Sequence, residues 1–272
     1  MGNFMGLVMG TLAEHGFDTS KMDRKDAIKK FNELKDEGKI SSSENKSTKN
    51  KIFEQSGVSI NDAGEYEIDY KQYDKVVAQR DEYFKNSFDD LEESLGETGY
   101  FKLRNSIDFY TKGFDAEING LLRGKEITDE NTKNIVERSI DRLNDAMDNF
   151  NIPEEITVFR NIDIIALKDI GIDEKNINDL VGKTYTEKGF SSSSLDRSIA
   201  ESFYKMRKKE TNREQVIFEI NIPKGKSKGL PLWNRSNFKE EQEFLIRSGA
   251  KFKIMSAEKD ENGRIVIKGD MQ

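Results

Sequence analysis

The sequence predicts an α+β fold in which helices come first and most strands follow. Over residues 66–149, apolar side chains recur at spacings of three and four, the period of a helix with one buried face. After Pro153 the pattern changes to short stretches in which apolar and polar residues alternate, as they do in strands. Helices and strands that are segregated in this way favour an α+β arrangement over repeated βαβ units.

Helices are predicted over residues 20–38, 70–95, 105–122, 132–149 and, among the strands, 196–208. The clearest helical face is carried by Ile107, Tyr110, Phe114, Ile118 and Leu121. Gly38 can end the first helix, and the polar stretch 41–51 that follows it is typical of a linker or long loop. We therefore expect an N-terminal segment, residues 1–65, and a larger domain, residues 66–272.

Strands are predicted over residues 156–160, 215–222, 243–247, 251–255 and 264–268, with another strand edge at 188–194. Within 215–222, one face carries Val216, Phe218, Ile220 and Ile222. The residues on this face are all apolar, which indicates that one side of the strand is buried.

The rarer residue types exclude several kinds of chemistry. The chain has no cysteine and a single histidine, His15, so thiolate nucleophiles, disulfides and Cys-ligated metal sites are impossible. Catalysis therefore has to use carboxylates, hydroxyls, Arg, Lys and aromatic side chains. The net charge is −7. No basic cluster is interleaved with aromatic residues, so we expect no nucleic-acid partner.

The N-terminus gives no targeting signal. It lacks the cationic start and the sustained apolar stretch of a secretory signal. The apolar stretch ends near Leu12, short of the roughly 20 residues of a membrane span. Gly2, Gly6 and Gly10 are spaced as in helix-packing motifs, and we expect a terminus or packing patch rather than a membrane-active segment. A cysteine-free chain suits both the cytosol and the exterior.

Three separated segments carry residues that can do chemistry. Residues 158–160 end a strand with an arginine, residues 188–194 hold four consecutive serines, and residues 238–243 hold three glutamates at the start of a strand. Each has a simpler explanation when taken alone: a surface charge, a helix-capping turn and a solvated acidic stretch. Their joint order along the chain favours a single site.

In this order the chain resembles the Arg-Ser-Glu class of bacterial mono-ADP-ribosyltransferase toxins. The likeness is closest to the enzymatic components of actin-modifying binary toxins and to Rho-modifying exoenzymes, and it extends from about Tyr66 to the C-terminus. Arg160 resembles the strand-end arginine of the family, and residues 192–194 resemble its Ser-Thr-Ser strand, with Ser in place of Thr. Glu241 and Glu243 resemble its Glu-x-Glu signature.

The resemblance implies a mono-ADP-ribosyltransferase fold, with a helical N-terminal part packed on two small β-sheets and an NAD cleft between them. It implies that Glu243 stabilises the cationic ribose of NAD, that Glu241 orients and deprotonates an acceptor arginine, and that Ser192 holds Glu243 in place. If the segment is extended, the two glutamates point to the same face. NAD would be the co-substrate, and no metal is required.

Further roles follow from the same resemblance. The implied nucleotide contacts are Arg160, Tyr110, Asn119, Arg123, Gly189, Phe203 and Arg207. Phe238 and Trp233 are implied in recognition of the target, in a surface loop. Asn161 stands where binary toxins often carry a second Arg, and the phosphate-binding Arg expected after Phe203 is replaced by either Arg207 or Lys205.

The implied activity is transfer of ADP-ribose from NAD to an arginine of a target protein, for which actin is one candidate. The alternatives are an NAD glycohydrolase that uses the same site and a non-catalytic virion or adaptor module. The N-terminal segment would serve delivery or docking, for instance on a translocation partner. We expect a protein that is secreted or delivered into a target cell without a recognisable signal peptide, or otherwise a cytoplasmic one.

Overall fold

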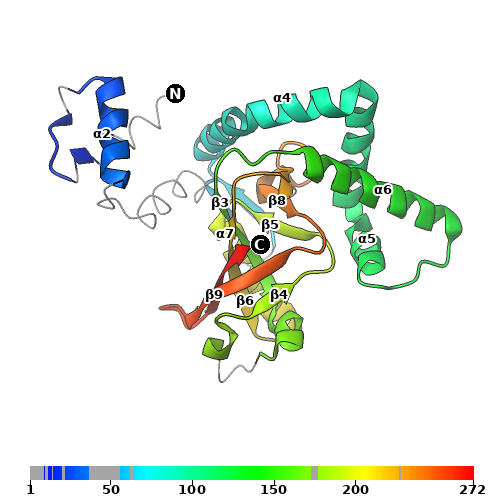
Figure 1. Ribbon diagram of the computed structural model, residues 1–272. Coiled ribbons are helices and arrows are strands. Elements are labelled where there is room, and N and C mark those ends of the chain that lie inside the picture. Colours follow the sequence, from blue (N-terminus) through cyan, green and yellow to red (C-terminus); the bar gives the residue numbers. More distant parts are fainter. Residues whose placement is uncertain are drawn as a thin grey trace. The chain divides into compact units, whose positions relative to one another are not determined.

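The alternating apolar stretches after Pro153 form one mixed sheet, which organises the larger unit of this computed structural model (Figure 1). The structure describes residues 9, 12–13, 15–19, 22–36, 56–61, 64–172, 177–226 and 228–272. The chain divides into two compact units, Met1–Ile52 and Phe53–Gln272. This division falls upstream of the predicted boundary between residues 65 and 66.

The sheet has eight strands in the order β4-β9-β10-β6-β3-β5-β8-β7. Their bounds are Ile156–Asp163 (β3), Thr184–Thr186 (β4), Ser191–Ser194 (β5), Gln215–Ile222 (β6), Gly229–Pro231 (β7), Glu243–Ile246 (β8), Lys251–Lys259 (β9) and Ile265–Met271 (β10). Strands β10 and β6 are parallel, and the other neighbours are antiparallel.

In place of the two expected sheets, the strands form one continuous sheet, because β3 and β5 pair with each other. The part with β4, β9, β10, β6 and β3 meets the part with β5, β8 and β7 through a single pair of residues, Phe159 and Ser194. One pair leaves the strands free to diverge beyond it. The predicted α+β class is confirmed.

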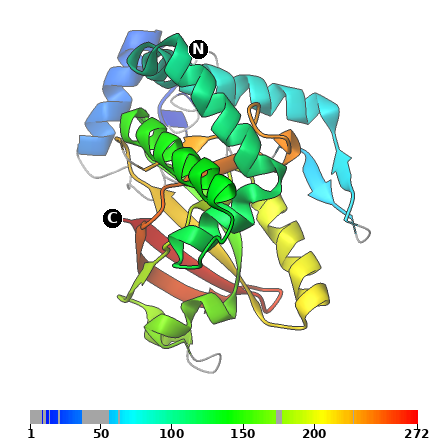
Figure 2. The ribbon, with the colours of Figure 1, turned by 90° about the vertical axis from the view of Figure 1, so that its right-hand side faces the viewer.

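The helices of the larger unit are α4 (Tyr70–Phe109), α5 (Asp115–Leu122), α6 (Glu130–Asn149) and α7 (Arg197–Thr211). The predicted helix 70–95 continues to Phe109, with a break at Gly96, whose φ of 64° suits glycine. The predicted helix 105–122 is interrupted by a π-helical turn, Tyr110–Phe114, in which Gly113 has a φ of 106°. α4 packs along α6, and α7 packs against β3 and β6 (Figure 2).

Aromatic side chains form two clusters in the core of the larger unit. Near α4 and α6, Phe84 contacts Phe150 and Trp233, with ring centroids 6.0 and 5.4 Å apart. At the other end, Phe218 meets Phe252 edge to face, at 5.5 Å. Such contacts add to the free energy gained from burying the rings.

The N-terminal unit contains helix α2 (Arg24–Asp36), within the predicted 20–38. Its N-cap, Asp23, accepts hydrogen bonds from the backbone N–H groups of Lys25 and Asp26, each at 2.8 Å. This unit has its own small core, formed by Leu12, Ala27, Phe31 and Leu34. The predicted linker 41–51, Gly38 and the glycines at 2, 6 and 10 lie outside the described residues.

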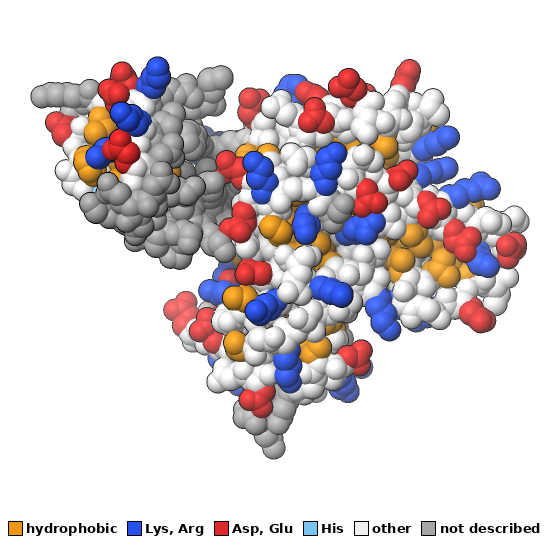
Figure 3. Space-filling view, in the orientation of Figure 1, with side chains coloured by type: hydrophobic (Ala, Val, Ile, Leu, Met, Phe, Trp, Pro, Cys, Tyr) orange, Lys and Arg blue, Asp and Glu red, His pale blue; other side chains and the backbone are white. Residues whose placement is uncertain are grey.

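None of the helices in the described parts of the chain is long and apolar enough to cross a membrane. On the face shown in Figure 3, the described Lys and Arg side chains are interspersed with Asp and Glu. That face therefore offers no uniformly basic surface.

A matched pair of glycine substitutions tests the packing at the edge of the sheet. A Cβ at Gly229 in β7 would lie 2.6 Å from both the Leu245 carbonyl oxygen and the Phe244 ring. Gly229→Ala should lower the free energy of unfolding by about 1–3 kcal/mol, because backbone atoms cannot give way cheaply. Urea denaturation measures the change.

Gly120→Ala is the control, because the nearest atom to its Cβ is Lys125 Cδ at 3.4 Å. This helical position should be neutral or gain up to about 1 kcal/mol. Equal destabilisation by both substitutions would contradict the packing argument.

Candidate active site

Two adjoining cavities, of about 330 and 590 Å³, open where the two parts of the sheet diverge. The smaller is lined by residues of β3, β5 and α7 and by Glu241 and Glu243. The larger continues along β3 toward Tyr185 and Gln215. Both share Arg123, Arg160, Asn161 and Arg207, so the four side chains lie along the passage between them.

The two glutamates reach the smaller cavity from a turn and not from an extended strand. Glu241 ends a short 3₁₀ helix (Lys239–Glu241), Gln242 is left-handed with φ 49° and ψ 45°, and Glu243 begins β8. The premise of an extended segment was therefore wrong. Both carboxylates nevertheless line the same cavity.

Gln242 fixes this turn from the protein interior. Its side chain is fully buried, accepts a hydrogen bond from the Arg80 guanidinium and donates one to the Lys239 carbonyl at 2.8 Å. Arg80 also donates to the Leu195 carbonyl at 3.3 Å. Burial lowers the pKa of Arg80 to about 10, so it stays cationic at neutral pH. Sequence reasoning missed both residues, because a lone Arg in a helix carries no pattern.

Glu243 is almost completely enclosed, with 6% of its surface exposed. Burial raises the pKa of its carboxyl to about 7, a hydrogen bond from Ser192 opposes the shift, and the charges of Glu241 and Asp115 add to it. The carboxyl therefore changes charge near neutral pH. A partly protonated buried carboxylate is typical of functional sites.

Glu241 is half-buried and has a separate partner. The Tyr66 hydroxyl donates a hydrogen bond to its Oε1 at 2.6 Å. Burial raises the pKa of Glu241, the Tyr66 hydrogen bond lowers it, and the charge of Glu240 raises it. The two glutamates thus have different surroundings, which allows them to do different work.

A chain of hydrogen bonds links the serine strand to α5. The hydroxyls of Ser192 and Tyr110 lie 3.1 Å apart, and Asn119 Nδ2 donates to the Tyr110 hydroxyl at 3.3 Å. Asn119 Oδ1 accepts from the backbone N–H of Phe190 at 2.7 Å. Burial raises the pKa of Tyr110 to about 12, so this hydroxyl stays protonated. Three predicted site residues are therefore directly connected.

Glu187, in the lining of the larger cavity, contacts two arginines that line both cavities, and sequence reasoning missed it. It accepts hydrogen bonds from Arg123 Nη2 at 2.9 Å and from the Gly189 N–H at 3.0 Å, and its Oε2 lies 3.9 Å from Arg160 Nη2. Burial by itself raises the pKa of Glu187, but Arg160, Gly189 and Arg123 lower it on balance. The carboxylate stays ionised and holds the two arginines near each other.

Gly189 is predicted as a nucleotide contact, and in the structure its lack of a side chain leaves room for Asn119 and Arg123. A Cβ there would lie 2.7 Å from Asn119 Oδ1 and 3.0 Å from Arg123 Nη2. Only glycine lets both side chains approach this strand edge.

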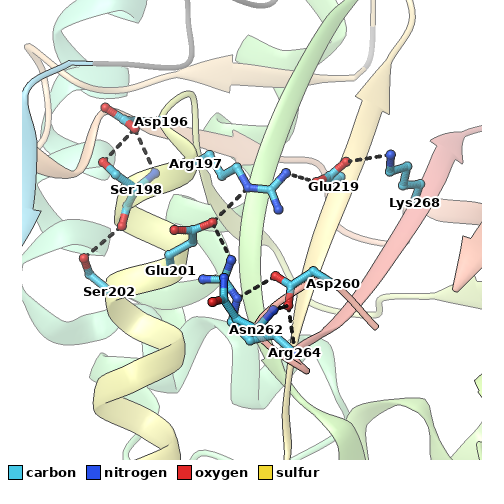
Figure 4. Close-up of polar contacts among 10 residues, drawn as sticks. All are labelled: Asp196, Arg197, Ser198, Glu201, Ser202, Glu219, Asp260, Asn262, Arg264 and Lys268. Carbon is cyan, nitrogen blue, oxygen red and sulfur yellow. Dashed lines mark hydrogen bonds and ion pairs between the residues drawn. The ribbon is translucent and has the colours of Figure 1, made fainter. Parts of the chain in front are cut away.

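Helix α7 carries Phe203 and Arg207 to the cavities. Asp196 caps its N-terminus by accepting from the Ser198 N–H at 2.9 Å. Figure 4 shows ion pairs that tie α7 to β6 and to the turn between β9 and β10: Arg197 with Glu201 (3.0 Å) and with Glu219, and Arg264 with Glu201 (3.2 Å) and with Asp260 (2.7 Å). Arg207 lines both cavities, whereas Lys205 lies on the exposed side of the helix.

The two residues expected to recognise the target differ from each other. Phe238 precedes the glutamate turn and is 48% exposed, as a contact surface requires. Trp233 is 1% exposed, and its Nε1 donates to Asp81 Oδ1 at 2.8 Å. The expected contact of Trp233 with the target is therefore wrong: Asn234 beside it in the loop is exposed, whereas the indole packs inward on Phe84.

Asn161 lines both cavities, and its Nδ2 donates to Gln215 Oε1 at 3.0 Å. Within the ranges that the structure describes, no three acidic or His side chains are grouped so that they could hold a metal ion.

Comparison with known proteins identifies a family and a fold. A family model described as ADP-ribosyltransferase exoenzyme matches residues 81–272. No curated protein matches the sequence. Among solved structures, Plx2a, an ADP-ribosyltransferase toxin from Paenibacillus larvae, is similar with a TM-score of 0.55 and 19% identity, over 72% of this chain and 96% of that one.

Two further structures are similar over 72% of this chain. C3stau2 from S. aureus with NAD has a TM-score of 0.53 and 18% identity over 95% of its own length. The ADP-ribosylating toxin BECa of a C. perfringens binary enterotoxin, with NADH, has a TM-score of 0.53 and 20% identity, but is covered over only 48% of its length. Likeness at this level of identity shows the fold.

Glu243 predicts a pH-dependent stability. Its pKa is about 7 in the folded protein and lies near 4.5 as the ordinary value. The folded state therefore binds the proton more tightly, and the free energy of unfolding falls as the pH rises from 4.5 to 7. Glu243→Gln removes this loss, so its gain over wild type should be on the order of 2 kcal/mol larger at pH 8 than at pH 5.

Urea denaturation of both proteins at the two pH values measures this difference. Glu258→Gln, at an exposed position of β9, serves as the control and should show no such gain. A gain from Glu243→Gln that is the same at both pH values would contradict the raised pKa.

Proposed function

The chain belongs to the ADP-ribosyltransferase exoenzyme family, and on this premise we propose that it transfers ADP-ribose from NAD to an arginine side chain of a target protein, with release of nicotinamide. The observation that carries the proposal is the pair of glutamates in one cavity, each with its own partner: Glu243 with Ser192, and Glu241 with Tyr66. The pair supplies one carboxylate for the ribose and one for the acceptor.

NAD would occupy both cavities. Its nicotinamide and the adjoining ribose would lie in the smaller one, between Phe203 and the glutamates, and its diphosphate would lie by Arg160, Arg123 and Arg207. Guanidinium groups bind phosphate with paired hydrogen bonds. Two structures of similar fold are described with NAD or NADH, which supports the choice of co-substrate.

The first half of the reaction breaks the bond between C1′ of the ribose and the ring nitrogen of nicotinamide. The electron pair leaves with neutral nicotinamide, and positive charge develops on the ribose as in glycoside hydrolysis. The ionised carboxylate of Glu243 stabilises this charge. Its enclosure strengthens the interaction, because little water screens it.

The second half forms a bond between C1′ and a guanidinium nitrogen of the acceptor. A guanidinium is cationic and a poor nucleophile, so it needs a base to accept its proton. Glu241 suits this task, because it is half-buried at the edge of the cavity beside the exposed Phe238. A target protein can reach this edge.

Two alternatives use the same residues. A glycohydrolase would pass the ribose to water and leave free ADP-ribose. A non-catalytic module would bind NAD without cleaving it. The burial of Glu243 argues against this alternative, because a buried carboxyl with a pKa of about 7 is costly in free energy and is typical of functional sites.

We assign catalysis to the larger unit, including the predicted domain 66–272, and a delivery or docking role to the N-terminal unit. Secretion or delivery into a target cell, and actin as the target, remain proposals taken from the resemblance.

The two glutamates should differ in their effects on activity. Glu243→Gln should lower NAD cleavage at least about a hundredfold, because the developing charge loses its counter-charge. Glu241→Gln should lose transfer to arginine but keep part of the hydrolysis of NAD. The assay incubates each purified protein with labelled NAD and a eukaryotic or a bacterial lysate, and follows labelled protein bands and free nicotinamide.

A band that appears with wild type and is absent with Glu243→Gln supports the transferase and gives the size of the target. Nicotinamide release without a band favours the glycohydrolase. No release by wild type favours the binding module, and equal loss of both activities in Glu241→Gln contradicts the division of work between the glutamates.

A further inference from the structure

We propose that Tyr66 is a positioning residue for Glu241, and that it holds the carboxylate in the orientation that receives the acceptor's proton. The inference rests on the proposed function. Tyr66 lies upstream of residues 81–272, the range that matches the family model, so this part of the site comes from a segment that the family match does not include.

Tyr66 belongs to a small hairpin formed by β1 (Val58–Ile60) and β2 (Tyr66–Ile68), in which it pairs with Ile60. The hairpin is fastened to helix α7. The Ser198 hydroxyl donates to the Val58 carbonyl at 2.6 Å, and the Ile60 N–H donates to the Ser202 hydroxyl at 3.2 Å. These hydrogen bonds fix the position of the hairpin, and with it Tyr66, along the axis of helix α7.

A second anchor lies just before the hairpin. Ser56 is fully buried, and both its backbone N–H, at 2.5 Å, and its hydroxyl donate to the buried Asp196, the N-cap of α7. Asp196 is also the charge that acts on the Arg80 guanidinium, which binds Gln242. The hairpin and the glutamate turn are therefore positioned by the same start of α7.

The contact itself has the form of a strong hydrogen bond. The distance of 2.6 Å from the Tyr66 hydroxyl to Glu241 Oε1 is typical of a hydroxyl that donates to a charged carboxylate. One oxygen of the carboxylate is occupied in this way, and the other remains to accept from a guanidinium. A carboxylate held through one oxygen cannot rotate freely, which preserves its alignment with the acceptor.

Tyr66 is suited to hold a proton and not to move one. Burial, the hydrogen bond to Glu241 and the negative charges of Glu241 and Glu240 all raise the pKa of Tyr66 well above its usual value. The hydroxyl therefore stays protonated through the reaction, and the acceptor's proton passes to Glu241.

The charges around Glu241 indicate a second consequence of the contact. Glu240 and Glu243 are acidic neighbours, Tyr66 is the donor, and burial also favours the neutral carboxyl. The Tyr66 hydrogen bond lowers the pKa of Glu241 against these effects. Without it, Glu241 should lose its proton only at a higher pH.

Tyr66→Phe tests the proposal, because it removes only the hydroxyl and keeps the ring. Tyr70→Phe, four residues further at a side chain 68% exposed, is the matched control. Both are compared with wild type in the full-length protein, using labelled NAD with agmatine as a small guanidine acceptor, and using NAD alone. We expect the ratio of transfer to hydrolysis to fall about tenfold in Tyr66→Phe and to stay at the wild-type value in Tyr70→Phe.

The acid side of the pH profile for transfer should also move to higher pH in Tyr66→Phe. In a Glu241→Gln background, Tyr66→Phe should cause no further change in hydrolysis, because the group it positions is gone. A thermal melt shows whether the variant is folded.

Three outcomes for Tyr66→Phe would overturn the proposal. The first is an unchanged ratio of transfer to hydrolysis, and the second is a parallel loss of transfer and hydrolysis with a lowered melting temperature. The third is a loss of hydrolysis in the Glu241→Gln background as large as the loss that Tyr66→Phe causes in the wild-type background. A wild-type protein that neither cleaves NAD nor modifies agmatine would instead refute the proposed function itself. The measurement on the wild-type protein therefore distinguishes failure of the Tyr66 proposal from failure of the proposed function.

Discussion

The contact between Arg80 and the buried side chain of Gln242 determines where both glutamates point. Gln242 has a left-handed backbone, which costs free energy for a residue with a Cβ, and the arginine holds it in that conformation. Because the 3₁₀ helix ends at this residue, Glu241 is left half-buried at the end of the helix, while Glu243 starts a buried strand. The distinct surroundings of the two carboxylates follow from this one turn.

The same geometry makes the site electrostatically unbalanced. Glu243 is enclosed near two other acidic groups, and its ionised form is disfavoured. In the lining of the larger cavity, Glu187 is kept ionised by Arg160 and Arg123, so each arginine has part of its charge compensated there. Keeping the Glu243 carboxylate buried near other acidic groups is costly in the free protein, but the carboxylate is ready to stabilise a positive charge that forms beside it.

The sequence indicates secondary structure with a clear period and site residues that occur in groups, but it indicates few of the functional residues that occur singly. The alternation in residues 215–222 predicted β6, and the joint order of Arg160, the serines and the glutamates predicted residues that the fold brings to one cavity. Arg80 and Glu187 escaped because one charged residue in a chain with 35% charged residues has no signature. The three-residue strands β4 and β7 are too short to show alternation, and the burial of Trp233 is not apparent from the polar residues that follow it, Asn234, Arg235 and Ser236.

Long-range hydrogen bonds show how far upstream the larger unit, to which we assign catalysis, extends. Ser56, Val58 and Ile60 all bind α7 or its N-cap, and Tyr66 binds a glutamate of the site. A division of the chain at residue 65 would separate the two strands of the hairpin, although the sequence pattern places it there, since a helical period begins only after Tyr66. Helix periodicity in the sequence shows only where the long helix begins. The long-range hydrogen bonds show which residues hold the site in place, and these residues begin further upstream, at Ser56.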